Sequence, residues 1–420
     1  MVRLLAGFGI GQGSGKPGAE FATQAAISVA ASPSASGARR APGGGCEAQM
    51  GHLADAVSRG RRCEGFSKKK TCDLNPLPFP ICLYERRRNA EKEEGSMTDS
   101  VLMVGATGHI GRHLVKALLG CGHEVLMLTR SRASRGPEDK RSMLIEAFMR
   151  QGAKRVEGSL EDAQSLERAC AQADAVVSTI DHRPDHLKLQ VALARAAAAS
   201  GRISRFIPSQ FGMDSRTYGQ GQVDHGDVKK ALQREFDASG VPITYVHING
   251  LATAWAASLG QLGLDSPPSD AIDVYGEGGI RFSMVTPEDV GQYAARTLFD
   301  PRTANRHVLI SPPENRLSQN ELIAIWEAKA RTKLRRRLVS ARELDDRLAA
   351  LANRKDKFGE LAFLQLIRAA WIDGLGDGRR RPDVLELTEL YPDTAYETIP
   401  QYLERFVPAM EVAQCLRARS

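Results

Sequence analysis

Three evenly spaced glycines constrain the fold of this chain more than any other feature. Gly105, Gly108 and Gly111 follow the apolar run SVLMV at 100–104, and apolar residues then recur every three to four positions. The run is typical of a buried strand, and the recurrence is typical of a helix face. Glycine at a strand-to-helix turn permits positive φ and lets a diphosphate approach the free N–H groups of the helix. The pattern therefore predicts a dinucleotide-binding turn.

Strands and helices alternate along the chain after this turn. The predicted strands cover residues 124–128, 155–158, 175–179, 205–208 and 243–248, and the predicted helices cover 162–172, 188–199 and 229–239. Repeated strand and helix units with apolar strands indicate a parallel sheet flanked by helices. We therefore expect an α/β fold with a Rossmann-type doubly wound parallel sheet.

The end of the second predicted strand bears on the choice of dinucleotide. NAD-binding sites usually carry Asp or Glu there, about 20 residues beyond the glycines, to bond the ribose hydroxyls. This chain has Arg130 at that place, 19 residues after Gly111. A guanidinium group can pair with a 2′-phosphate through two hydrogen bonds, so the sequence favours NADP(H) over NAD(H). The alternative is an exposed arginine that merely ends a strand.

The first 96 residues differ in composition from the rest of the chain. They hold 14 Lys and Arg against nine acidic residues, in Gly-, Ala- and Ser-rich runs without a helical or strand period. Such a segment buries too little apolar area to offset the entropy of ordering it, so we expect a disordered extension over 1–96. The codons of Lys-Glu-Glu at 92–94 can spell a ribosome-binding sequence just before Met97, which favours a translated leader. A transit peptide or a basic nucleic-acid-binding arm is the alternative.

Cysteine spacing and apolar runs bear on the compartment. None of the seven cysteines forms a C-x-x-C pair, which argues against a zinc site and favours a reduced, cytosolic chain. No apolar run approaches the roughly 18 residues that cross a bilayer. We therefore expect a cytoplasmic protein with no membrane partner.

Longer motifs resemble one family. Between about residues 102 and 407 the chain contains, in order, GATGHIG, VEGSLEDAQSL, RFIPSQFGMD, SGVPITYVHIN, NRLSQNELIAIWE and ELYPDTAYETIPQYLERF. Together these segments resemble the isoflavone reductase-like, or NmrA-like, branch of atypical short-chain dehydrogenases, which includes phenylcoumaran benzylic ether and pinoresinol-lariciresinol reductases. The resemblance implies an NADPH-binding Rossmann domain at 97–250. It also implies a smaller C-terminal α/β substrate-binding portion at 251–420, some of whose strands rejoin the Rossmann sheet.

A lysine is the candidate group for proton transfer. Ordinary short-chain dehydrogenases use Tyr-x-x-x-Lys, but Tyr218 and Tyr245 both lack a lysine four residues later. The resemblance instead implies a lysine at the start of a helix, eleven residues before Gly240, and this position is Lys229. Burial, the neighbouring Lys230 or the oxidised nicotinamide would have to lower its pKa from about 10.4 for it to act as a base. The alternatives are Lys230 or a solvated lysine pair.

The resemblance also implies the residues around the cofactor. The candidate cofactor-binding residues are Gly105, Thr107, Gly108, His109, Ile110, Gly111, Arg130, Arg141, Ser178, Thr179, Pro208, Ser209, Phe211, Lys229 and Asn249. Residues 105–111 would hold the diphosphate, and Arg141 or Lys140 would add a second cation at the 2′-phosphate. The pair 178–179 would lie near the ribose, and residues 208–211 beneath the nicotinamide. For each the alternative is a loop or strand-end residue that only packs.

The chain departs from the family pattern near the expected substrate. Gln233 stands where the family commonly has Arg, Gln210 replaces the acid of S-E-F-G, and the segment 250–255 replaces a usually aromatic stretch. These departures leave the identity of the substrate open.

The remaining histidines and arginine runs carry little functional signal. Pro184 separates His182 from His186 and argues against a helix that aims both at one metal, so we predict no metal site. Solvated or core positions are the simplest interpretation for these histidines and for His225. The arginine runs at 335–337 and 379–381 are interpreted as charged surface, which argues against specific nucleic-acid binding.

Two functions follow from these observations. The first is an NADPH-dependent reductase of a small, aromatic substrate, acting as a monomer or homodimer, with lysine-assisted proton transfer. The second is a non-catalytic NADP(H) sensor, because NmrA-like relatives include regulators. Lys229 favours the enzyme, since a sensor needs only the cofactor site.

Overall fold

The structure is a computed structural model that describes residues 98–130, 139–377 and 381–407. These residues belong to one compact unit of the chain. The extension predicted over 1–96, the residues Ser131 and Arg132, and the arginines Arg379 and Arg380 lie outside the described residues.

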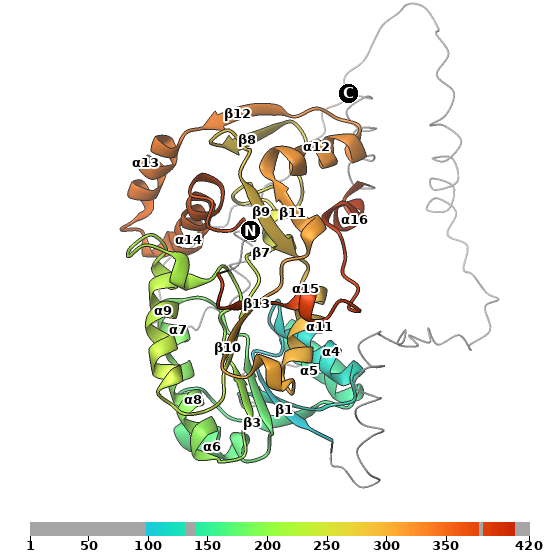
Figure 1. The fold of residues 1–420 in the computed structure, drawn as a ribbon, viewed down its shortest axis with the longest axis vertical. Coiled ribbons are helices and arrows are strands. Elements are labelled where there is room, and N and C mark those ends of the chain that lie inside the picture. The colour runs from blue at the N-terminus through green and yellow to red at the C-terminus, as the bar shows by residue number, and fades with distance from the viewer. Residues whose placement is uncertain (1–97, 131–138, 378–380, 408–420) are drawn as a thin grey trace, which may run out of the picture. The chain divides into compact units, whose positions relative to one another are not determined.

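A five-stranded parallel sheet forms the lower half of the molecule in Figure 1. Its strands are β1 (Ser100–Val104), β2 (Glu124–Thr129), β3 (Lys154–Glu157), β4 (Ala175–Ser178) and β5 (Arg205–Ile207). The strand order is β3-β2-β1-β4-β5, with every pair parallel. This order reverses direction at β1, which is the topology of a doubly wound Rossmann-type sheet. The predicted fold class is therefore confirmed.

Helices cover both faces of this sheet because the residues of β1 alternate between two apolar cores. Val101 and Met103 belong to the core under α4 (Gly111–Gly120) and α11 (Pro287–Thr297). Leu102 and Val104 belong to the opposite core, together with residues of α6 (Ala163–Cys170), α8 (Gln190–Ala199) and α9 (Asp224–Asp237). Strand residues point alternately to the two faces, so all of β1 is buried.

A second parallel sheet continues beside β5. It has the order β13-β10-β6 and consists of β6 (Thr244–His247), β10 (Arg306–Leu309) and β13 (Val384–Glu386). A single parallel bridge joins Phe206 of β5 to Ile243 before β6, and the Phe206 N–H donates to the carbonyl of Pro242. Short helices α15 (Leu387–Leu390) and α16 (Ile399–Glu404) follow β13. The domain boundary at residue 250 stays a prediction.

The upper half of the molecule in Figure 1 is built from small sheets and helices. Its sheets are β11-β9-β7, from β7 (Gly250–Leu251), β9 (Arg281–Val285) and β11 (Arg316–Ser318), and β12-β8, from β8 (Ala271–Tyr275) and β12 (Arg335–Val339). Its helices are α10 (Ala252–Trp255), α12 (Gln319–Ala330), α13 (Ala341–Leu351) and α14 (Phe358–Ile367), the last followed by a π-helical turn at 368–372. Trp255, Trp326 and Trp371 lie in one apolar core that these elements share.

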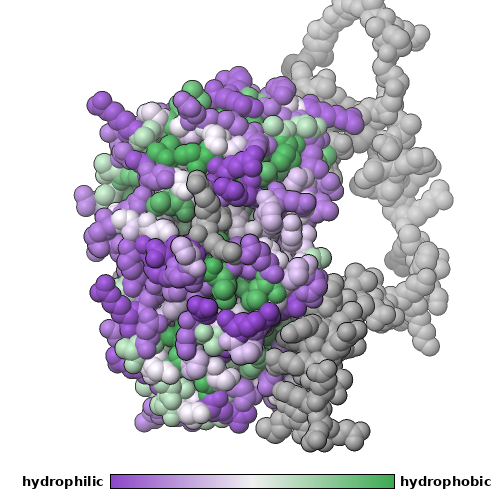
Figure 2. All heavy atoms as spheres, viewed as in Figure 1, coloured by the Kyte–Doolittle hydropathy of each residue, from purple (hydrophilic) through white to green (hydrophobic). Residues whose placement is uncertain are grey.

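The face seen in Figure 2 is mostly hydrophilic, with hydrophobic residues in separate patches. Arg335 and Arg337 contribute to the charged surface, where they pair with Asp270 and Asp273. In the part of the chain that the structure describes, no helix is long and apolar enough to cross a membrane.

The observed helices differ from the prediction in three places. Helix α5 (Lys140–Arg150), capped by Asp139, is not predicted at all. The helix predicted at 188–199 divides into α7 (Pro184–Lys188) and α8, and Pro184 starts α7 because proline is tolerated in a first turn. The helix predicted to begin at Lys229 begins at Asp224, so the lysine lies in the second turn rather than at the start.

Candidate active site

The glycine turn after β1 has no room for side chains. Gly105 has φ +86, and a Cβ atom on it would lie 2.8 Å from the carbonyl oxygen of Thr179. A Cβ atom on Gly111 would overlap the carbonyl oxygen of Gly105 and lie 2.6 Å from the Thr179 hydroxyl oxygen. These approaches keep the end of β4 and the start of α4 against the turn, so two of the three glycines are needed on steric grounds.

The start of α4 suits an anionic group. Its N-cap, Ile110, makes no side-chain capping bond, and the first turn holds no acidic residue. A helix N-terminus of this kind offers N–H donors and the positive end of the helix dipole. The glycine turn and the uncapped helix start fit the diphosphate of a dinucleotide, which is the role predicted for residues 105–111.

Two predicted cations, Arg130 and Arg141, flank the segment 131–138. Arg130 follows β2 and is exposed, and its carbonyl oxygen accepts a hydrogen bond of 2.8 Å from Arg155. Arg141 lies in the first turn of α5, and Lys140 beside it is exposed. The intervening residues 131–138 lie outside the described part, so the shared role of Arg130 and Arg141 at a 2′-phosphate stays a prediction.

A cavity of about 240 Å³ extends from the glycine turn to α9. It brings together the predicted residues His109, Ile110, Thr179, Ser209, Phe211, Lys229 and Asn249. It is also lined by apolar residues that the sequence did not single out, among them Ile180, Met213, Trp255, Phe363 and Leu366. The cavity lining therefore combines polar residues, some of them at the dinucleotide turn, with many hydrophobic ones.

Lys229 is a buried cavity residue rather than a solvated one. Its side chain is 6% exposed, and burial lowers its pKa to about 8. No hydrogen bond of its amino group is found within the described residues, and a Cβ atom on Gly212 would lie 3.7 Å from Nζ. The alternative of a solvated lysine pair is therefore wrong for Lys229. Its catalytic role stays a prediction.

Lys230 points elsewhere. Its Nζ donates a hydrogen bond of 2.7 Å to the backbone carbonyl oxygen of Tyr218, and it is not among the residues that line the cavity. Of the two candidate lysines, the structure therefore places only Lys229 at the cavity.

The two glutamines that depart from the family pattern meet beneath Lys229. The Gln233 amide donates to the Gln210 side-chain oxygen at 3.4 Å and to the Ser215 hydroxyl at 3.3 Å. The Gln210 amide in turn donates to the backbone carbonyl oxygen of Lys229 at 3.4 Å. A neutral amide pair thus occupies the place of an acid and an arginine in the family, and neither position brings a charge close to Lys229.

Two cavity residues, His182 and His225, were interpreted from the sequence as solvated or core histidines. His225 is 6% exposed, lies one turn before Lys229 on α9, and lines the cavity together with His182. The signal was the spacing of four residues between His225 and Lys229, which puts both on one helix face. It was overlooked because the predicted helix began too late to include His225.

Three predicted residues, Ser178, Thr179 and Ser209, lie at the ends of β4 and β5. The Thr179 hydroxyl donates to the carbonyl oxygens of Val104 and Gly105 at 3.2 and 3.1 Å and so ties the end of β4 to the glycine turn, and its place near the ribose stays a prediction. The Ser178 hydroxyl is buried without a partner among the described residues. Ser209 donates to the carbonyl oxygen of Ile180 at 2.7 Å. These contacts orient the cavity wall.

The last two predicted residues, Pro208 and Asn249, differ in whether they line the cavity. Pro208 is buried and is not among the cavity-lining residues. Asn249 lines the cavity with φ 49, a left-handed conformation that bends the chain between β6 and β7.

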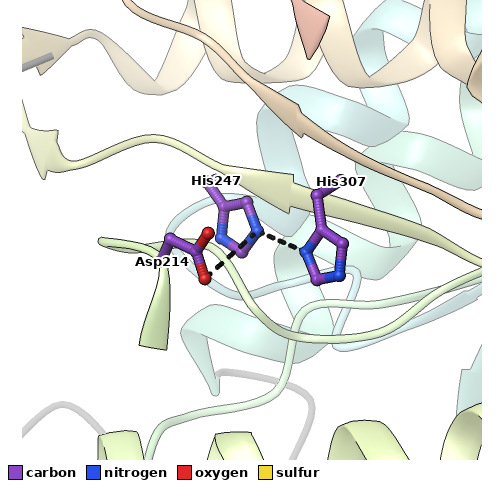
Figure 3. A group of neighbouring side chains, drawn as sticks. All are labelled: Asp214, His247 and His307. Carbon is purple, nitrogen blue, oxygen red and sulfur yellow. Dashed lines mark hydrogen bonds and ion pairs between the residues drawn. The ribbon is translucent and has the colours of Figure 1, made fainter. Parts of the chain in front are cut away.

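One group of described residues has the geometry of a metal site, Asp214, His247 and His307 (Figure 3). His247 Nε2 lies 3.0 Å from His307 Nδ1 and 3.9 Å from an Asp214 oxygen. Arg216 donates to both Asp214 oxygens, so this carboxylate is already paired, and the two histidines come from the neighbouring strands β6 and β10. The absence of a metal site stays a prediction.

The fold and cavity define the class of this protein. A Rossmann-type sheet, a glycine turn at a helix start and an adjoining cavity with a buried lysine are features of dinucleotide-dependent oxidoreductases. The profile of the NmrA-like family matches residues 97–403. The chain belongs to this family.

Similar proteins and structures agree with this assignment. The chain is 35% identical to a bifunctional pinoresinol-lariciresinol reductase of Thuja plicata, over 73% of this chain and 98% of the relative. It is 34% identical to phenylcoumaran benzylic ether reductase PT1 of Pinus taeda, over 73% and 98%. The solved structure of AtPrR2 with NADP+ and (+)pinoresinol is 34% identical, with a TM-score of 0.68 over 74% of this chain and 100% of that one.

These findings confirm the predicted family and enzyme class. The protein is an NADP-dependent oxidoreductase of the isoflavone reductase-like branch, and its cofactor is NADPH. The sensor alternative has no observation in its favour.

Proposed function

We propose that this protein reduces a small phenylpropanoid-type aromatic substrate with NADPH, and that Lys229 moves the proton. The observation that carries the proposal is the buried amino group of Lys229, which lines the same cavity as the dinucleotide turn. When bound, the nicotinamide supplies a hydride, so the protein has to position the substrate and handle protons.

The hydrophobic wall of the cavity supports an aromatic substrate. Trp255 and Phe363 lie with their ring centroids 5.6 Å apart and line the cavity together with Leu366. Such a wall suits a flat ring, whereas a few polar groups fix its orientation.

Lys229 supports proton transfer at an oxygen of this ring. With a pKa of about 8, its amino group is partly neutral near neutral pH and can take the proton of a ring hydroxyl. Loss of that proton pushes electrons through the ring and breaks the bond between the benzylic carbon and an oxygen, and addition of the hydride to this carbon leaves the ring oxygen as a phenolate. Protonated Lys229 returns its proton to the phenolate, and the expelled oxygen takes up a proton from solvent, so that one hydride and one proton are consumed in each turnover.

The same proposal includes the cytoplasm as compartment and a monomer or homodimer as assembly. Cys121 and Cys170 are buried thiols without a disulfide, and burial raises the pKa of Cys170 to about 12. Unreactive thiols of this kind are usual in a reduced compartment.

A substrate screen tests the proposal. Benzylic ethers, enones and quinones of the phenylpropanoid class are incubated with NADPH, and loss of the reduced nicotinamide absorbance is followed. Products from deuterated NADPH are then examined by mass spectrometry, and we expect one deuterium at a benzylic or conjugated carbon. Tight NADPH binding without turnover across the panel would contradict the proposal.

A further inference from the structure

Three polar side chains at one end of the cavity are available to a ligand. No hydrogen bond of Lys229 Nζ or of His182 is found within the described residues, and His225 Nδ1 is buried without a partner there. The other polar groups nearby are occupied. Asp181 accepts hydrogen bonds from Arg183 and is paired with His186, and His109 lies 2.6 Å from the Thr253 hydroxyl.

The two histidines lie next to one another. Their ring centroids are 5.1 Å apart, and the ring of His182 also stacks on Phe358 at 5.4 Å. His182 follows β4, whereas His225 lies on α9 one turn before Lys229, so His225 and Lys229 share a helix face. Residues four apart on a helix have Cβ atoms about 5–6 Å from each other. The lysine and the histidine pair therefore offer two neighbouring polar positions in a mostly apolar cavity.

Both imidazoles are neutral under ordinary conditions. Burial, together with the charge of Lys229, lowers the pKa of His182 to about 4 and that of His225 well below its usual value. A neutral imidazole has one N–H donor and one acceptor nitrogen. A pair of them suits a hydroxyl group, which accepts a hydrogen bond from one ring and donates to the other. A methoxyl group can only accept, and it leaves one buried nitrogen unpaired.

We propose that His225 and His182 bind a second ring hydroxyl, adjacent to the hydroxyl that meets Lys229, and so select vicinal dihydroxy rings. This inference rests on the proposed function, because it places a substrate ring against Lys229. It adds a specificity that Lys229 alone does not supply, since one lysine cannot distinguish the substituent beside its own hydroxyl.

The first test compares three versions of one substrate that differ only in the ring, namely 3,4-dihydroxy, 4-hydroxy-3-methoxy and 4-hydroxy. We expect wild-type kcat/KM to be highest for the dihydroxy ring, by about tenfold or more over the methoxy ring, the scale of one lost hydrogen bond to a buried group. His225→Phe should bring this ratio close to one, and His182→Phe, which keeps a ring against Phe358, should reduce it. His225→Asn restores a donor and an acceptor and should recover part of the preference.

The ratio separates recognition from a structural role. A variant that merely disturbs α9 lowers kcat/KM for all three rings by the same factor and leaves the ratio unchanged, which would overturn the inference. A wild-type enzyme without preference for the dihydroxy ring would overturn it as well.

A binding measurement distinguishes this inference from the proposed function. Catechol, 2-methoxyphenol and phenol are titrated by calorimetry into the full chain saturated with NADP+. If catechol binds more strongly than the other two phenols and His225→Phe abolishes this difference, the result supports hydroxyl binding by the histidine pair, even where no substrate is turned over. Turnover with equal binding of the three phenols supports the proposed function and contradicts the histidine pair.

Discussion

The glycine turn and the histidine–lysine end of the cavity adjoin each other, but they are specified in different ways. The turn lies within seven consecutive residues, and its requirements come from the backbone, as the absence of room at Gly105 and Gly111 shows. The cavity end is assembled from β4, α9 and α14, and its properties come from side chains such as Lys229 and His225. Binding of the common cofactor is thus encoded locally, whereas substrate chemistry depends on contacts between distant segments.

This difference predicts that changes in one region leave the function of the other intact. The turn should control affinity for the dinucleotide, and the cavity end should control turnover and substrate choice. Residues that act on both would contradict this division.

The largest expected effect comes from Lys229→Met, which removes the amino group and keeps an apolar chain of similar length. We expect kcat to fall by about 10²–10⁴, as for a lost acid–base group, while NADPH affinity changes by no more than about threefold. Steady-state kinetics and calorimetry measure the two quantities. Lys230→Met is the matched control, because Lys230 bonds the Tyr218 carbonyl oxygen outside the cavity. Full activity of Lys229→Met would remove this residue from the mechanism.

Arg130→Asp tests the cofactor site beyond the turn, at the end of β2, through the choice between NADPH and NADH. Loss of a charge-assisted phosphate pair costs about 1.5–3 kcal/mol, which corresponds to about ten- to a hundredfold in affinity for NADPH. NADH lacks the phosphate, so the affinity for NADH should change little. The preference of the protein for NADPH over NADH should therefore become smaller or reverse. Calorimetric dissociation constants for both dinucleotides decide the matter, and equal binding of the two by wild type would refute the role of Arg130.

Gly111→Ala perturbs the turn sterically. The added methyl group would overlap the Gly105 carbonyl oxygen, so we expect a loss of stability of about 1–3 kcal/mol and weaker NADPH binding. Thermal unfolding with and without NADPH measures both effects. Gly279→Ala is the control, since a Cβ atom there meets nothing within 4 Å. An unchanged NADPH affinity in Gly111→Ala would mean that the turn does not bind the diphosphate.

The smallest expected effect is a pH dependence that Lys229 imposes. If its neutral amine is the base, kcat/KM should rise with pH and level off above about 8, the pKa that burial gives this lysine. Stability relative to Lys229→Met should also rise from pH 8 toward the ordinary lysine value, because the unfolded chain binds the proton more tightly than the folded chain over that range. A kcat/KM profile that is flat between pH 6 and 9 would argue against this base.

Much of the fold was predictable because its signals are local. The β1 strand, the glycine turn and α4 are specified by residues 100–120, and apolar strands between helices were enough to predict a parallel sheet. Helix α5 was missed because its apolar face is weak and partly exposed, with only Phe148 fully buried. The start of α9 was missed because Gly226, in the first turn of the helix, lies against the Tyr218 ring and does not act as a helix breaker.

The sequence by itself determined the family, the dinucleotide turn and the candidate lysine, because each is carried by short motifs of consecutive or nearby residues. Only the tertiary structure decided that Lys229 is buried, that Gln210 contacts Gln233, and that His182 lies against His225. Burial and pairing arise when segments far apart in the chain, from β4 to α14, fold onto one cavity. Since these contacts set the pKa of the lysine and the polarity around it, the chemistry of the site is a property of the packed molecule.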